Sequence, residues 1–188
     1  MPIRRYTRVA VVLHWLVAAL IVINVLLAWT WHSLSKPNAH SVVNVHKSIG
    51  LTVLGLALLR LLWRIGHRPP DLPAAYQRWE SVLSHIVHGF LYLIMFGLPI
   101  TGYIMDSASK ASGQPIMWFG LIPIPHLGAI MQLAPGEKQH VRHLFAAAHS
   151  LSAVALYVLL FLHIAGALKH QFIDREKEIQ RMSWGSRG

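Results

Sequence analysis

Four long stretches with almost no charged side chains limit what this chain can fold into. Residues 9–31, 81–105 and 144–168 contain no Asp, Glu, Lys or Arg, and residues 45–65 reach a similar length only if Arg60 is included. About 20 helical residues cross the hydrocarbon core of a bilayer. Because backbone polar groups in hydrocarbon must be paired within the segment, each stretch is expected to be a helix. The sequence therefore predicts an all-α integral membrane protein, a transmembrane bundle of four helices.

The composition supports one membrane domain over residues 1–188, with residues 106–143 as an outer loop at the membrane interface. Only 13% of residues are charged, whereas soluble domains have roughly a quarter. The chain has no cysteine. This excludes disulfides, cysteine-bound iron–sulfur clusters and covalent haem attachment through a C-x-x-C-H motif.

The basic residues predict the orientation, because cytoplasmic loops carry an excess of Lys and Arg. Twelve lie on the side that both termini share: Arg4, Arg5, Arg8, Arg60, Arg64, Arg68, Arg78, Lys169, Arg175, Lys177, Arg181 and Arg187. The other side has five: Lys36, Lys47, Lys110, Lys138 and Arg142. Both termini are therefore predicted to be cytoplasmic. The net charge of +10 is interpreted as this topology signal, with the lipid bilayer and no nucleic acid as partner.

Histidines inside the apolar stretches are the main candidates for function. The chain has 13 histidines, and a polar side chain in lipid is costly unless it faces the bundle interior and finds a partner. Six of them are placed within the membrane: His14, His46, His85, His88, His149 and His163.

Helix geometry arranges four of these histidines as two pairs. His149 and His163 are fourteen positions apart, which is close to four turns, so they share one helix face about 21 Å apart along the axis. His14 matches the depth of His163, and His46 matches the depth of His149. Facing imidazoles in a helical bundle are an axial-ligand arrangement for haem, so two haems are predicted. On spacing alone, His85 or His88 could replace an inner ligand.

Arg60 lies fourteen positions after His46, on the same helix face and at the level of the inner histidines. Its guanidinium could hold a haem propionate. The alternative is an arginine that extends to the membrane edge and only sets the topology.

Several segments together resemble the prokaryotic cytochrome b561 family from Tyr6 to Met182: "YTRVAVVLHWL", "VHKSIG", "RLLWR", "SHIVHGFLYLIMFGLPITGYIM" and "LKHQFIDREKEIQRM". The resemblance implies a bacterial inner-membrane protein of four helices with two b-type haems. The family's ligand positions fall on His14, His46, His149 and His163. His85 and His88 would then be neighbouring polar groups.

The resemblance also implies electron transfer between the quinone pool and the periplasmic face. The most concrete activity in the family is superoxide oxidation coupled to ubiquinone reduction, which would make the protein an oxidoreductase. Lys47 is then expected to steer superoxide, helped by Lys110, Lys138 and Arg142. Lys169 and His170 are expected to donate hydrogen bonds to a quinone. Arg60 is expected to give the inner haem the higher potential.

Three other functions remain open at this point. The protein could be a cytochrome b that oxidises quinol, or an anchor subunit that delivers electrons to a periplasmic redox partner. It could also be a metal or proton transporter that uses its intramembrane histidines. The absence of acidic residues from the apolar stretches argues against transport.

Overall fold

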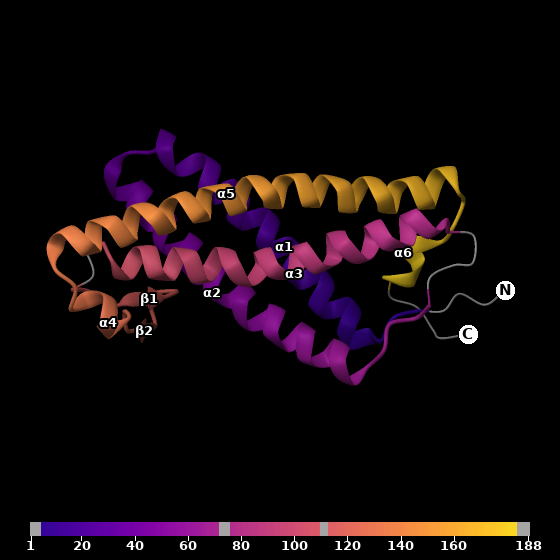
Figure 1. Ribbon diagram of the computed structural model, residues 1–188, viewed down its shortest axis with the longest axis horizontal. Helices are drawn as coiled ribbons and strands as arrows, with labels where there is room; N and C mark the ends of the chain where they lie inside the picture. The colour runs from indigo at the N-terminus through magenta and orange to yellow at the C-terminus, as the bar shows by residue number, and fades with distance from the viewer. Residues whose placement is uncertain (1–4, 72–75, 110–112, 184–188) are drawn as a thin grey trace.

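The structure is a computed structural model that describes residues 5–71, 76–109 and 113–183. Three of the basic residues counted for the orientation lie outside the described residues: Arg4, Lys110 and Arg187. Four long helices dominate the fold (Figure 1): α1 (Arg8–Thr30), α2 (Lys36–Gly66), α3 (Arg78–Ser107) and α5 (Pro135–Leu168). All four are long and apolar enough to cross a membrane. The prediction of a four-helix membrane bundle is confirmed.

Two helices start earlier than expected. Helix α2 begins at Lys36 and not near 45, and α5 begins at Pro135 and not near 144. Both have proline in the first turn, where its missing N–H costs nothing and its fixed φ favours helix. Hydropathy marks only the part of a helix that lies in hydrocarbon, so it does not detect these polar first turns. The expected loop 106–143 is therefore partly helical.

The remaining elements are short. They are the 3₁₀ turn η1 (Trp31–Ser33), strands β1 (Ile116–Trp118) and β2 (Ile122–Ile124), helix α4 (Gly128–Met131), the π-helical turn η2 (Lys169–Ile173) and helix α6 (Glu178–Arg181). Figure 1 shows β1, β2 and α4 at one end of the long helices and α6 at the opposite end. The two ends of the bundle are therefore covered by different structures.

The hairpin of β1 and β2 is anchored to α2. The strands are antiparallel, with Trp118 opposite Ile122, and their turn has positive φ at Phe119 (48°) and Gly120 (73°), as hairpin turns require. The backbone N–H of Phe119 donates to Ser48 Oγ at 2.9 Å. Trp118 Nε1 donates to Thr52 Oγ1 at 3.1 Å. The hairpin therefore covers the face of α2 that carries Ser48 and Thr52.

The core of the bundle is thin, and its outer surface is apolar. One buried cluster joins α1, α2 and α3 through Val17, Ile49, Val53, Ala57 and Met95. A second joins α3 and α5 through Val87, Leu91, Ile94 and Leu156. Large apolar side chains such as Leu151 (72% exposed) and Phe161 (70% exposed) point outward. Such a surface suits lipid as the surrounding solvent.

The start of α1 and the segment after α6 meet at one end of the bundle. Tyr6 N–H donates to the carbonyl of Arg181 at 3.2 Å, and Trp15 Nε1 donates to the carbonyl of Met182 at 2.7 Å. These bonds bring the two extremes of the described chain to the same side of the membrane.

Candidate functional site

Four of the six intramembrane histidines face each other in two pairs. His14 on α1 faces His163 on α5, with ring centres 6.1 Å apart and planes inclined by 68°. His46 on α2 faces His149 on α5, with ring centres 6.4 Å apart and the same inclination of 68°. We call these the inner pair and the outer pair. The structure thus brings together the residues that the fourteen-residue spacing matched by depth.

The separation within each pair suits one metal ion between two imidazoles. With metal–nitrogen bonds of about 2.0–2.1 Å, two imidazoles on opposite sides of one metal have ring centres roughly 6.3 Å apart. Both observed separations lie close to this value. The ring of His88 lies only 5.0 Å from that of His163, which leaves too little room for a metal between them. Geometry therefore favours His14 over His88 as the partner of His163.

The other two intramembrane histidines bond to their own helix. His88 Nδ1 donates to the carbonyl of Ser84 at 2.6 Å. His85 Nδ1 donates to the carbonyl of Ser81 at 2.6 Å, and His85 faces outward. Of the two, only His88 touches the inner pair.

The outer pair lines a cavity of ≈ 180 Å³ between the four long helices. Its walls are mostly apolar, and two glycines, Gly50 and Gly102, form part of them. A Cβ atom at Gly102 would lie 3.3 Å from His149 Cε1, closer than the usual 3.5–4.0 Å between carbon atoms. The glycine therefore leaves His149 free to keep its present orientation. The mostly apolar lining and the two facing imidazoles suit a flat, apolar ligand with a metal at its centre.

Both imidazoles of the outer pair have one nitrogen hydrogen-bonded. His46 Nδ1 lies 3.1 Å from the carbonyl oxygen of Asn24, and His149 Nδ1 lies 3.0 Å from that of Leu98. Because a carbonyl oxygen only accepts, the proton must be on Nδ1 in both rings. Nε2 is then the nitrogen left for a metal, which is the usual arrangement of histidine ligands.

The inner pair has a different environment. His14 Nδ1 is buried and has no hydrogen-bond partner among the described residues. Unlike Nδ1 of His46 and of His149, this nitrogen is therefore not held by a carbonyl oxygen of the described residues. Arg60 is within electrostatic range of His14 and His163, and its guanidinium carbon lies 5.5 Å from the centre of the Tyr92 ring. Arg60 is therefore at the level of the inner pair, as its spacing from His46 predicts.

Lys47, the residue expected to attract an anion, is already paired. Its Nζ lies 2.6 Å from Asp106 Oδ1, and the other carboxylate oxygen lies 3.1 Å from His126 Nε2. Of the other basic residues expected on this face, Arg142 is exposed and Lys138 is half-buried, both on the first turns of α5. Among the described residues expected to attract an anion, Arg142 and Lys138 therefore offer more free positive charge than Lys47 does. Lys36, at the start of α2, is also exposed on this face.

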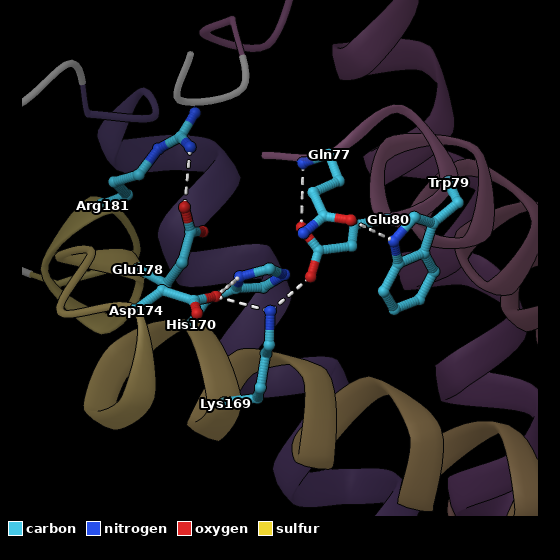
Figure 2. A network of polar contacts seen from close by, with 8 residues as sticks. All are labelled: Gln77, Trp79, Glu80, Lys169, His170, Asp174, Glu178 and Arg181. Carbon is cyan, nitrogen blue, oxygen red and sulfur yellow. Dashed lines mark hydrogen bonds and ion pairs between the residues drawn. The ribbon is translucent and has the colours of Figure 1, made fainter. Parts of the chain in front are cut away.

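Lys169 and His170, the expected quinone donors, belong to a polar cluster at the opposite end (Figure 2). Lys169 Nζ donates to the buried carboxylate of Glu80 and lies 2.8 Å from Asp174 Oδ2. His170 Nδ1 lies 2.7 Å from the same Asp174 oxygen, and its ring stacks on Tyr76 at 3.9 Å. The π-helical turn η2 widens the backbone here and is a feature frequent at functional sites. We call these residues the inner cluster.

The edges of this inner cluster are also held by polar contacts. Arg181 donates to Glu178 at 2.8 Å and to the carbonyl of Asp71 at 2.7 Å. The hydrogen bond from Lys169 lowers the pKa of Asp174, and burial raises the pKa of Tyr76 well above its usual range. Asp174 is therefore an anion at neutral pH, and Tyr76 is a neutral phenol.

Sequence reasoning missed the partners of these residues. Asp106 and Glu80 are acids at helix ends, and nothing in their local sequence indicates that they pair with Lys47 and Lys169. Only the i, i+4 spacing of His170 and Asp174 gives a local signal. The Oγ1 atom of Thr101 lies 3.2 Å from His149 Nδ1. The two residues are 48 positions apart, so the local sequence gives no signal of this contact.

Comparison with known proteins identifies the family. A model of the family described as prokaryotic cytochrome b561 matches residues 5–185. The chain is 32% identical to "Cytochrome b561 homolog 2" of Escherichia coli K12 over 181 residues, which is 95% of this chain and 90% of the relative. It is 27% identical to "Probable superoxide oxidase CybB" of Yersinia pestis over 190 residues, which is 98% and 99% of the two chains. The protein thus belongs to the prokaryotic cytochrome b561 family of haem b-binding membrane electron-transfer proteins.

Proposed function

We propose that the protein carries two haem b groups and transfers electrons from superoxide at the periplasmic face to ubiquinone at the cytoplasmic face. The observation that carries this proposal is the presence of two histidine pairs that share helix α5, with one partner on α1 and the other on α2, each with the spacing of two imidazoles around one metal. The name of the Yersinia pestis relative, a probable superoxide oxidase, supports superoxide as the donor.

His46 and His149 are the proposed ligands of the outer haem, and His14 and His163 those of the inner haem. When bound, haem b would supply a one-electron carrier at each pair. The side chains of the four long helices exclude water from the pairs. The bonds from His46 to Asn24 and from His149 to Leu98 hold the outer rings in one orientation.

Arg60 is the proposed partner of a propionate at the inner pair, because it is a half-buried guanidinium within electrostatic range of His14 and His163. A positive charge near a redox centre favours the reduced state. Arg60 therefore favours electron flow toward the inner pair.

The proposed orientation has both termini in the cytoplasm, with the hairpin and α4 at the periplasmic face. It is supported by the uneven distribution of Lys and Arg. On the periplasmic face, Arg142 and Lys138 are the proposed attractors of superoxide, since the charge of Lys47 is balanced by Asp106.

The inner cluster is the proposed quinone end. His170 uses Nδ1 with Asp174, which leaves Nε2 for a quinone oxygen, while Lys169 is engaged by two carboxylates. Reduction of one ubiquinone consumes two electrons and two protons, and it converts two superoxide anions into two molecules of dioxygen. The imidazole of His170, held by the Asp174 carboxylate, is suited to pass those protons from the cytoplasm.

The test begins with a reduced-minus-oxidised absorption spectrum and the ratio of haem to purified protein. Two haems are expected in the wild type, and about one in His14→Ala, His163→Ala, His46→Ala and His149→Ala. His85→Ala and His88→Ala are the matched controls and should keep both. A wild-type protein that binds fewer than two haems would refute the proposal.

The second step adds a superoxide-generating system and ubiquinone. Haem reduction and quinol formation are expected, and added superoxide dismutase should abolish both. Reduction of the haems by ubiquinol, with no response to superoxide, would instead assign outward flow to a periplasmic partner. Isolation of a large partner subunit with the protein would favour the anchor function.

A further inference from the structure

Thr101 lies beside the ring of His149, one of the proposed haem ligands. Its Oγ1 is 3.2 Å from His149 Nδ1, and the same nitrogen is 3.0 Å from the carbonyl oxygen of Leu98. Since the proton is on Nδ1, the ring N–H is shared between two oxygen acceptors. A three-centre bond of this kind fixes both the tautomer and the rotation of the imidazole.

The hydroxyl of Thr101 is itself held in place. Oγ1 donates to the carbonyl of Gly97 at 2.7 Å, with the carbonyl of Leu98 also within reach at 3.0 Å. Because its only proton is used toward these carbonyls, the lone pairs of Oγ1 remain for His149. Thr101 therefore acts as an acceptor toward the ring and not as a donor.

The two histidine pairs differ in this respect. In the outer pair, both rings donate from Nδ1, to Asn24 in one case and to Leu98 and Thr101 in the other. In the inner pair, Nδ1 of His14 has no partner among the described residues, and the positive charge of Arg60 is close. All four rings are imidazoles, but the hydrogen bonds and charges around the outer pair differ from those around the inner pair.

This difference has a direct electronic consequence. An imidazole that donates a strong hydrogen bond from its distal nitrogen becomes a more basic ligand. A more basic ligand stabilises the ferric state and lowers the reduction potential, and hydrogen bonding is one of the protein's means of setting that potential. The outer site is therefore biased toward the oxidised state, and the inner site toward the reduced state.

We propose that Thr101 is a positioning residue that lowers the reduction potential of the outer haem below that of the inner haem. The hydroxyl achieves this by sharing the Nδ1 proton of His149 with the Leu98 carbonyl. The inference rests on the proposed function, in which His46 and His149 hold a haem. It adds the reason why electrons would run inward.

The experiment is a potentiometric titration of the two haems in the wild type and in Thr101→Val, followed by visible absorption. The outer midpoint potential should rise in Thr101→Val by roughly a tenfold change in the oxidised-to-reduced ratio, which is 59 mV for a one-electron couple. The inner midpoint should stay unchanged. Thr101→Ser, which keeps the hydroxyl, should restore the wild-type value. The variants His46→Ala and His163→Ala assign the two transitions.

Thr30→Val is the matched control. The Thr30 hydroxyl makes the same kind of bonds to its own helix, to the carbonyls of Leu26 at 3.0 Å and Leu27 at 3.3 Å, but it is at the end of α1 and is not part of either pair. Thr30→Val should leave both potentials unchanged.

Three outcomes would overturn the inference. The first is an unchanged outer potential in Thr101→Val, and the second is an equal shift of both potentials, which indicates a general structural effect. The third is loss of the outer haem in both Thr101→Val and Thr101→Ala, because the hydroxyl would then hold the haem and not tune it. The haem ratio of the wild type is measured separately. A value below two refutes the proposed function itself.

Discussion

Replacement of Gly102 on α3 tests how closely the backbone must approach His149. A Cβ atom at this position would lie 3.3 Å from Cε1 and 3.4 Å from Nδ1 of the imidazole. Since unstrained contacts lie at about 3.5–4.0 Å, the ring must shift by a few tenths of an ångström. A Cβ atom at Gly97, on the same helix, would meet no atom of the described residues within 4 Å. Gly97→Ala is therefore the matched control.

The two substitutions should have opposite effects on stability. Exchange of glycine for alanine inside a helix contributes about 0.5–1 kcal/mol, and Gly97→Ala should gain this amount. Gly102→Ala has the same gain, but crowding in a packed site costs about 1–3 kcal/mol. The net effect of Gly102→Ala is expected to be a loss of about 1 kcal/mol, measured by thermal unfolding in detergent. Gly102→Val should lose more.

The effect on the outer haem should be larger than the effect on stability. Disturbance of a group that orients a metal ligand typically costs about 10–100-fold in affinity, so Gly102→Ala should weaken haem binding at the outer pair by about tenfold. The assay is a haem titration of the apoprotein, with the final ratio of haem to protein. Equal haem affinity in Gly97→Ala and Gly102→Ala, or two firmly bound haems in Gly102→Val, would refute the reasoning.

Three further perturbations follow from the charged groups. Arg60→Gln should lower the midpoint potential of the inner haem and leave the outer one unchanged; equal shifts in a potentiometric titration would contradict this. Asp106→Asn removes the carboxylate that balances the charge of Lys47. The rate of haem reduction by superoxide should then rise severalfold at low salt and less at high salt. A rate that does not depend on salt would count against electrostatic attraction of superoxide by Lys47. The bond with Lys169 lowers the pKa of Asp174 in the folded protein. The ionised Asp174 carboxylate therefore stabilises the fold at pH values above the ordinary aspartate pKa, and this stabilisation is lost as the pH falls through the lowered pKa. Asp174→Asn should therefore be less stable than the wild type at neutral pH, and the difference in unfolding temperature should close in acid; a difference that does not change with pH would contradict this sign.

The depth and pairing of the four facing histidines are predictable because they depend on regular geometry. A helix repeats every 3.6 residues, so fourteen positions between His149 and His163 place both on one face without knowledge of any contact. The choice between His14 and His88 is different. It depends on the rotation of α3 against α5, which side-chain packing determines.

Charge partners and helix starts were not predictable for two separate reasons. Lys169 and Glu80 are 89 positions apart, and only the assembled bundle brings them together. The first turns of α2 and α5 lie outside the apolar stretches, and polar residues such as Lys36 and Glu137 are equally compatible with loop and helix. Proline in the first turn was the available signal for both starts.

The stacking of the two pairs along α5 has an electrical consequence. Fourteen helical residues span about 21 Å, which is roughly seven-tenths of a hydrocarbon core about 30 Å thick. An electron that moves inward from the outer to the inner pair would cross most of the transmembrane voltage toward the negative side. At about 2.3 kcal/mol per elementary charge per 100 mV, this is about 1.6 kcal/mol of work per electron for every 100 mV of membrane voltage. Inward transfer would therefore charge the membrane, and a highly energised cell would slow it.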